Sequence, residues 1–173
     1  AAELALMQQA KSMTLEVQRR AARILHPGIR ASEVARFLDQ AHRAIGAPGG
    51  NGFVIVQFGR ASAFPHGLPG DAELREGDVV LIDTGCVIEG YHSDITRTYV
   101  FGEPSAEQRR IWALEQEAQA AAFNAARIDV PCETVDHAAR AVLERAGLGP
   151  DYRLPGLPHR TGHGIGLSIH EPA

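Results

Sequence analysis

The sequence has 173 residues, of which 45% are hydrophobic and 22% are charged, and it carries a formal net charge of -4. That composition is typical of a globular chain with enough length for one sizeable core or two small ones. The aliphatic runs at residues 53–56 and 79–82 are far shorter than the ~20 residues that cross a bilayer, which excludes a membrane span. Lys and Arg are scattered, so nothing favours nucleic acid as a partner. We expect a cytoplasmic protein, because Cys86 and Cys132 lie far apart without a CxxC spacing.

Two helices are predicted in the first part of the chain. Apolar residues recur at intervals of three and four over residues 4–25, as in an amphipathic helix, and the Pro-Gly pair at 27–28 ends this pattern. Ser32 is the predicted N-cap of a second helix, and Gly46 lies just past its end. His42 falls inside this second helix, where we expect a surface or cap residue.

Three strands are predicted after these helices. Aromatic and β-branched residues place them at 53–58, 78–88 and 91–101. The last two runs flank Glu89-Gly90, so we expect them to form a hairpin.

The helical pattern restarts in the second half. A capping box at residues 105–108 begins a second helical pair, which ends at Gly147. Shifting the first half by 101 residues superposes Gly46 on Gly147, so the helix-helix-turn unit recurs as an internal repeat. The same shift places the partner of the hairpin past the last residue. Because a sheet without those strands would expose an unpaired edge, we expect residues 1–173 to be an incomplete domain of a longer chain.

Two carboxylates in the hairpin form the first candidate site. If the turn is centred on Ile88-Glu89, Asp83 and Asp94 face each other across the strands, whereas a two-residue slip leaves them diagonal. Two such charges at ~5 Å, in an effective dielectric near 20, repel by roughly 3 kcal/mol. Either one carboxyl stays protonated or a divalent cation lies between the two. In an ordinary hairpin, a turn-end hydrogen bond or an ion pair with Arg97 is the alternative.

Histidines crowd the last fifteen residues and form the second candidate site. Glycine flanks His163 on both sides, which leaves the imidazole facing open space rather than packed neighbours. Imidazole and carboxylates together are a mixed N/O donor set that fits Mn, Fe, Co or Zn. His159 and His170 are uninformative alone, and so is His66, which lies in a tight turn before the hairpin.

Four blocks of the sequence occur in an order that is specific when taken jointly. They are IDTG at residues 82–85, GYHSDITRT at 90–98, HRTGHGIGL at 159–167 and HE at 170–171. In this order they resemble the pita-bread metallopeptidases, and within that family the Xaa-Pro dipeptidases, or prolidases, more than the methionine aminopeptidases. The resemblance covers nearly the whole chain. It implies an α/β (α+β) pita-bread fold, in which a pseudo-twofold repeat of helices surrounds a mainly antiparallel sheet, here truncated in its second half.

The resemblance also implies a site with two divalent metal ions. Asp83 would bind one ion with both carboxylate oxygens, Asp94 would bridge the two ions, and His163 would hold the other. Manganese is the metal we expect, with Co, Zn or Fe as alternatives. In the family, substrate-side histidines hydrogen-bond the peptide and the developing tetrahedral intermediate; they match His66, His159 and His170 here.

The implied activity is hydrolysis of the peptide bond before proline in dipeptides or short peptides, by a homodimer. The family's two downstream glutamate ligands and its N-terminal domain have no match in residues 1–173, so these residues alone are expected to bind metal weakly and to be inactive. The alternatives are an aminopeptidase P or methionine aminopeptidase-like activity, a metal-free creatinase-like hydrolase, and an inactive pita-bread domain that binds peptides or partners. The mutual repulsion of Asp83 and Asp94 argues against the metal-free hydrolase.

Overall fold

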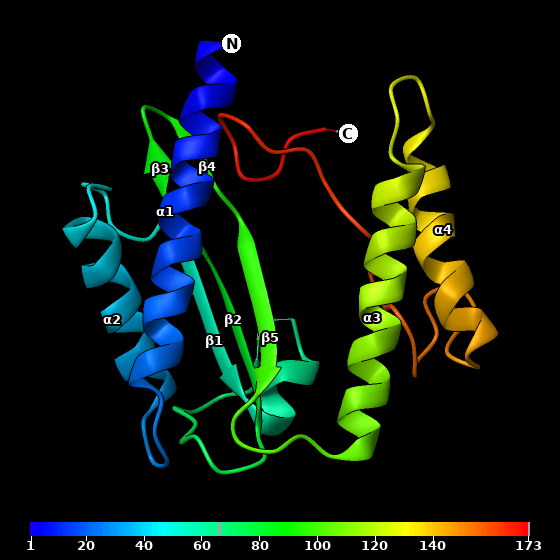
Figure 1. Ribbon diagram of the computed structural model, residues 1–173, viewed down its shortest axis with the longest axis horizontal. Coiled ribbons are helices and arrows are strands. Elements are labelled where there is room, and N and C mark those ends of the chain that lie inside the picture. Colours follow the sequence, from blue (N-terminus) through cyan, green and yellow to red (C-terminus); the bar gives the residue numbers. More distant parts are fainter. Residues whose placement is uncertain (66, 173) are drawn as a thin grey trace. The chain divides into compact units, whose positions relative to one another are not determined.

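The computed structural model of the protein describes residues 1–65 and 67–172. The chain forms two compact units, of which the first comprises Ala1–Pro104 with Ile165–Glu171 and the second comprises Ser105–Gly164 with Pro172. Figure 1 labels the helices and strands of each unit. None of the helices in the described residues has the length and apolar character needed to cross a membrane.

The first unit is a small antiparallel sheet with two helices packed against it. Its elements in chain order are α1 (Ala2–Ile24), α2 (Ala31–Ala44), β1 (Phe53–Phe58), the 3-10 helix η1 (Gly59–Ala63), β2 (Val79–Gly85), β3 (Val87–Ile88), β4 (Tyr91–His92) and β5 (Ile95–Val100). The longer strands lie in the order β1-β2-β5, and β3 pairs with β4 in a separate two-stranded ladder. The two helices and the first strand predicted for this half are therefore confirmed, whereas each predicted strand of the hairpin is split in two, at Cys86 and at Ser93-Asp94.

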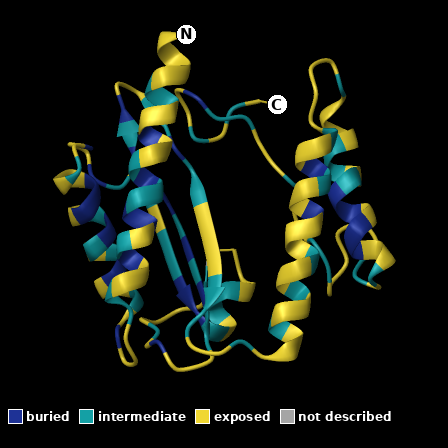
Figure 2. Ribbon diagram, in the orientation of Figure 1, coloured by how far each residue is buried: buried dark blue, intermediate teal, exposed yellow. Residues whose placement is uncertain are grey.

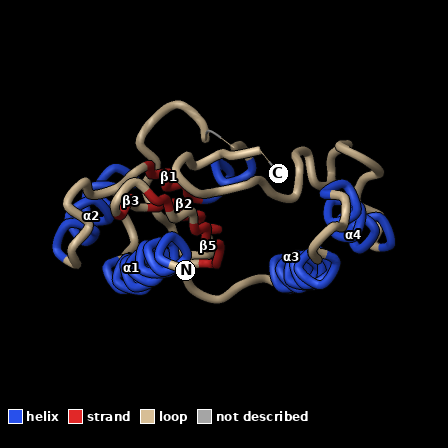
Figure 3. Tube along the Cα trace, turned by 90° about the horizontal axis from the view of Figure 1, so that it is seen from above, coloured by secondary structure: helices blue, strands red, loops and turns tan. Residues whose placement is uncertain are grey.

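Burial alternates along the central strand β2, because successive side chains of a strand point to opposite faces. Val80 and Ile82 are fully buried and pack in one apolar cluster with Val17 of α1 and Leu38 of α2. Figure 2 shows buried stretches in dark blue on both helices and on the strands, and Figure 3 shows the two helices beside the strands. Asp83 alternates with the buried residues and is only half-buried, so it lies on the face of the sheet away from α1 and α2.

The hairpin turns at Glu89-Gly90, but its register differs from the one that opposes the two carboxylates. Glu89 and Gly90 both have positive φ, 49° and 88°. This is the geometry of a two-residue type I′ turn, whose twist matches that of the flanking strands. It pairs Asp83 with Thr96. Direct opposition of Asp83 and Asp94 is therefore wrong, and the two-residue slip, which makes them diagonal neighbours, is what the structure has.

The second unit is a helical hairpin. It consists of α3 (Ala106–Ala125) and α4 (Cys132–Arg145), and their shared apolar core contains Ala118, Ala122, Ala139, Val142 and Leu143. The capping box predicted at the start of α3 is present. The internal repeat is confirmed, because α2 and α4 each have 14 residues and begin and end 101 residues apart. The glycines that follow them, Gly46 and Gly147, both have positive φ, 104° and 80°.

The start of α2 differs from the prediction. The N-cap is Arg30 rather than Ser32, so the helix begins two residues earlier than expected. The amide and the hydroxyl of Ser32 donate instead to the carboxylate of Asp71, at 2.9 and 2.7 Å. The hydrogen bond from the Ser32 amide, followed by the one from its hydroxyl, lowers the pKa of the Asp71 carboxyl. This capping group comes from 39 residues along the chain, so a local sequence pattern does not reveal it.

Candidate metal centre

The candidate centre begins where the ladder of the hairpin is interrupted, at Ser93 and Asp94 between β4 and β5. The Ser93 amide donates to the Cys86 carbonyl at 3.0 Å, and the Cys86 amide donates to the Ser93 hydroxyl at 3.0 Å. Beside them, a Cβ added to Gly85 would lie 1.7 Å from the Ser93 carbonyl oxygen. Only glycine therefore allows the two strands to approach so closely, and Asp94 directly follows this buried anchor.

Asp83 lies on the same hairpin, on the face of the sheet away from α1 and α2. Its register partners are Ile55 of β1 and Thr96 of β5. Diagonal positions across antiparallel strands are typically about 7–8 Å apart, which is within reach of side chains that extend toward each other. The diagonal register therefore remains compatible with a cation shared by Asp83 and Asp94.

His170 reaches the centre from the segment Ile165–Glu171, which belongs to the first unit. The His92 amide donates to the Gly166 carbonyl at 2.9 Å, which ties this segment to β4. A carboxylate oxygen of Asp94 and a ring nitrogen of His170 lie within 4.8 Å of each other. The structure thus brings together one residue predicted as a metal ligand and one predicted as a substrate-side histidine.

His159 and His163 belong to the second unit. Each ring has its Nδ1 near the carbonyl oxygen of the following residue, at 2.8 Å for His159 and 2.9 Å for His163. A proton on Nδ1, donated to that carbonyl, puts the lone pair on Nε2, which is the arrangement of a histidine that binds a metal or accepts a proton. Their approach to Asp83 and Asp94 stays a prediction. The remaining predicted catalytic residue, His66, lies outside the described residues.

The donor set suits a divalent transition metal. Asp83 and Asp94 offer hard carboxylate oxygens, and His163, the predicted nitrogen ligand, offers the Nε2 atom of its imidazole when Nδ1 donates to the Gly164 carbonyl. Carboxylate with imidazole, and no thiolate among these three residues, fits Mn, Fe, Co or Zn rather than a metal that prefers sulfur. The residues present therefore fit the metal ions that the sequence predicts.

Sequence reasoning missed a buried polar residue behind this centre. His42 was expected at the surface or at a cap, but it is fully buried, and this burial lowers the pKa of its imidazole. A signal was available, because His42 lies four residues after Leu38 and eight after Val34, on the buried stripe of α2. Thr14 on α1, also fully buried, contacts the His42 ring at 3.1 Å.

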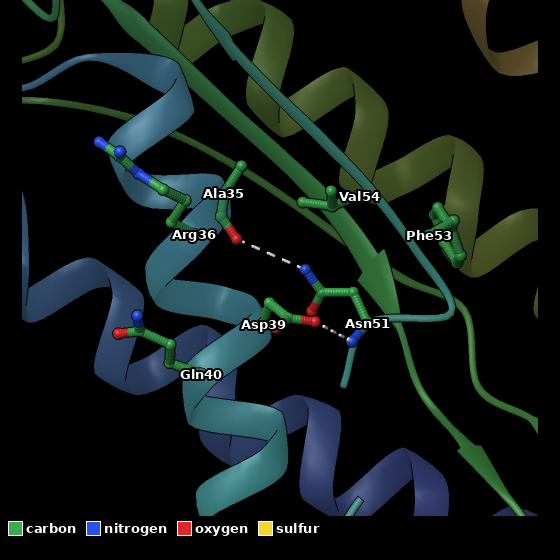
Figure 4. A pocket seen from close by; sticks show the side chains of 7 residues that line it. All are labelled: Ala35, Arg36, Asp39, Gln40, Asn51, Phe53 and Val54. Atoms are coloured by element: carbon green, nitrogen blue, oxygen red, sulfur yellow. Dashed lines mark hydrogen bonds between the residues drawn. The ribbon is translucent and has the colours of Figure 1, made fainter. Parts of the chain in front are cut away.

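A separate open hollow of about 470 Å³ lies between α2 and the start of β1 (Figure 4). It is lined by Ala35, Arg36, Asp39, Gln40, Asn51, Phe53 and Val54. The backbone amide of Asn51 donates to the Asp39 carboxylate at 3.1 Å, and both residues line the hollow. None of these lining residues is a candidate ligand, so the hollow is distinct from the candidate centre.

A family model and curated relatives both place the chain in the family that the sequence resembles. The model of metallopeptidase family M24 matches residues 5–173. A curated relative, "Probable dipeptidase PepE" of Mycobacterium bovis, is 44% identical over 172 residues, which are 98% of this chain and 44% of that protein. An uncharacterized peptidase of Staphylococcus aureus is 38% identical over 147 residues, 85% of this chain and 40% of its own length.

Solved structures agree with these relatives. An Xaa-Pro dipeptidase from Bacillus anthracis superposes with a TM-score of 0.91 at 33% identity, over 99% of this chain and 47% of its own. Dipeptidase PepE from Mycobacterium ulcerans gives 0.90 at 41% identity, over 99% of this chain and 45% of its own. The chain thus spans somewhat less than half the length of these proteins, and the predicted pita-bread fold is confirmed. On the family match over nearly its whole length, the chain belongs to metallopeptidase family M24.

Proposed function

We propose that the protein containing this chain hydrolyses the peptide bond before proline in dipeptides or short peptides, with two divalent metal ions as cofactors. The observation that carries the proposal is that a carboxylate oxygen of Asp94 and a ring nitrogen of His170 lie within 4.8 Å of each other. Asp83 lies on the same hairpin as Asp94. Similarity to an Xaa-Pro dipeptidase and to PepE dipeptidases supports the substrate class. The proposal concerns the whole protein, within which residues 1–173 form part of the catalytic domain.

In this proposal the protein's own residues divide into ligands and proton-handling groups. Asp83 would hold one ion with both oxygens, Asp94 would bridge, and His163 would hold the second ion. Divalent ions in such a site supply a Lewis acid for the scissile carbonyl and lower the pKa of a water molecule to about 7. Manganese is the proposed metal, since hard oxygen ligands and imidazole both suit it.

The substrate-side histidines would act on the peptide itself. An imidazole N–H can donate to the oxyanion that develops on the scissile carbonyl, and an imidazolium can protonate the leaving proline nitrogen. The proposed groups for these roles are His66, His159 and His170. The position of His170 beside Asp94 supports its place at the reacting carbonyl.

The test replaces a ligand without changing its shape. Asp94→Asn in the whole protein removes one charged oxygen ligand, and we expect loss of bound metal by mass spectrometry and at least a hundred-fold loss of Ala-Pro cleavage. Glu89→Gln removes a charge from the exposed turn of the same hairpin and is the matched control. This variant should retain both the bound metal and Ala-Pro cleavage. Full metal content and turnover in Asp94→Asn would refute the assignment.

Two further parts of the proposal are a homodimer, which the family resemblance implies, and a cytoplasmic location, which the cysteine spacing favours. Light scattering of the whole protein at micromolar concentration tests the first, and a mass of one chain would exclude it. Activity that survives a chelator would instead favour a metal-free hydrolase on the same fold.

A further inference from the structure

A chain of buried hydroxyl groups joins α1 to the interruption in the hairpin. Thr14 Oγ1 lies 2.8 Å from Ser93 Oγ and 3.1 Å from the Nε2 atom of His42. Ser93 Oγ in turn accepts from the Cys86 amide at 3.0 Å and lies 3.3 Å from the Cys86 carbonyl. Thr14, His42 and Cys86 have no exposed surface, and Ser93 is 4% exposed.

Donors and acceptors match at every hydrogen bond between these buried groups when His42 is neutral. With the proton on Nδ1, His42 donates to the Leu38 carbonyl at 3.1 Å, Thr14 donates to Nε2, and Ser93 donates to Thr14. With the proton on Nε2, His42 donates to Thr14, Thr14 donates to Ser93, and Ser93 donates to the Cys86 carbonyl. In this tautomer Nδ1 accepts from the side-chain amide of Asn51 at 2.6 Å. In both tautomers the hydroxyls of Thr14 and Ser93 each have an acceptor. Replacing either residue therefore leaves buried polar groups without a partner, which costs about 1–3 kcal/mol per group.

These bonds converge on the residue that precedes Asp94. Ser93 is fixed through its hydroxyl by Thr14, through its amide by the Cys86 carbonyl, and through its carbonyl by the close approach of Gly85. One peptide bond separates this anchor from the Asp94 side chain. The direction in which Asp94 leaves the backbone is therefore set from the helix side of the sheet, away from the face that carries Asp83.

We propose that Thr14 is a positioning residue of the metal centre, which acts through Ser93 to hold the Asp94 carboxylate in the orientation that binds the ion. This inference rests on the proposed function, because it takes Asp94 as a ligand. Groups that orient metal ligands typically contribute 10–100-fold to metal affinity. The sequence pattern places Thr14 on the buried stripe of α1, four residues after Ala10 and three before Val17, but does not identify its partners.

The test uses three variants of the whole protein on helix α1. Thr14→Val removes the hydroxyl at nearly constant volume, and we expect Mn²⁺ binding, measured by calorimetry with MnCl₂, to weaken about ten-fold. Thr14→Ser keeps the hydroxyl and should bind Mn²⁺ within about three-fold of the unaltered protein. Val17→Ala, which trims a fully buried apolar residue one turn away, should lower stability without changing the Mn²⁺ dissociation constant.

A second readout follows the backbone of the metal-free protein. The Ser93 amide should exchange its hydrogen at least ten-fold faster in Thr14→Val than in Thr14→Ser. Equal Mn²⁺ affinity in Thr14→Val and the unaltered protein would overturn the positioning role alone, as would an equal loss in Val17→Ala. Failure of the unaltered whole protein to bind Mn²⁺ would overturn the proposed function as well, so the two failures are distinguishable.

Discussion

At Gly85 the backbone of β2 passes so close to the Ser93 carbonyl that the position tolerates no side chain. An added methyl group would lie 1.7 Å from that oxygen, and rotation about a side-chain bond does not relieve a clash at Cβ. The strands would have to separate next to Asp94. Gly85→Ala should therefore lower the free energy of unfolding by about 3 kcal/mol, as for other overpacked sites, and weaken metal binding. Urea unfolding and Mn²⁺ calorimetry on the whole protein measure the two effects.

Gly49→Ala is the control for this substitution. A Cβ at Gly49 would meet nothing within 4 Å, and Gly49 does not have the positive φ of many other glycines in the chain. Its unfolding midpoint should stay close to that of the unaltered protein. If Gly85→Ala behaves in the same way, the close approach of the strands does not constrain the centre.

Individual residues were predicted unevenly from the sequence. Asp83 and Asp94 were singled out because two carboxylates on one hairpin repel each other, but their roles as metal ligands come from the family resemblance and stay a prediction. The buried residues Thr14 and His42 were missed, because their role depends on contacts 79 and 28 residues away along the chain. Apolar periodicity alone can thus reveal a polar residue on the buried stripe of a helix, although it does not identify the hydrogen-bond partner of that residue.

On the scale of elements, α4 holds a segment that has no regular secondary structure. Arg140 and Asp136 form an ion pair at 2.7 Å on this helix, with side chains only 7% and 19% exposed. They hydrogen-bond the backbone of the segment at Asp151, Leu157, His159 and Thr161. Burial by itself would raise the pKa of Asp136, but the hydrogen bonds from Arg140 and Thr161 outweigh it, so the pKa is lowered. One ion pair therefore orders the stretch that leads to His163.

Arg140→Met should release this stretch. The change leaves the Asp136 carboxylate without its cation and three carbonyls without a donor, which typically costs about 3–5 kcal/mol for a buried pair. Hydrogen exchange in residues 151–163 should rise by at least a hundred-fold, as read by mass spectrometry of the whole protein. Arg145→Met on the same helix is the matched control, because the Arg145 and Glu117 side chains are 65% and 60% exposed. Exchange that stays equal in the two variants would contradict the role given to Arg140.

The elements themselves were largely predictable, whereas their pairing was not. Apolar periodicity and capping residues located α1, α2, α3 and α4, since these signals act within one or two turns of a helix. The hairpin was placed around Glu89-Gly90, as observed, but its register stayed open between two alternatives, because it depends on positive φ at Glu89, which is not a glycine. The N-cap of α2 was missed because Asp71 supplies the capping group from a distant loop.

On the scale of the whole molecule, the repeat extends to the hydrogen bonds that end its helices. Gly46 donates to the Arg43 carbonyl at 3.2 Å, and Gly147, 101 residues later, donates to the Glu144 carbonyl at 2.9 Å. Gly28 and Asp129, at the same offset, both have positive φ. Helix lengths and cap geometry thus recur where residue identity does not. This recurrence is why pattern matching found the repeat although the sequence identity between the halves is weak.

A metal centre built from separate parts of the chain should stabilise the folded protein as a whole. An ion that binds only the folded state adds about 2.7 kcal/mol to the free energy of unfolding when its concentration is one hundred times its dissociation constant. MnCl₂ should therefore raise the melting temperature of the whole protein, and excess EDTA should reverse the rise. Asp83→Asn and Asp94→Asn should each abolish most of this shift, whereas Glu89→Gln should retain it. A melting temperature that does not respond to Mn²⁺ would show that the carboxylates of the hairpin serve some purpose other than binding this ion.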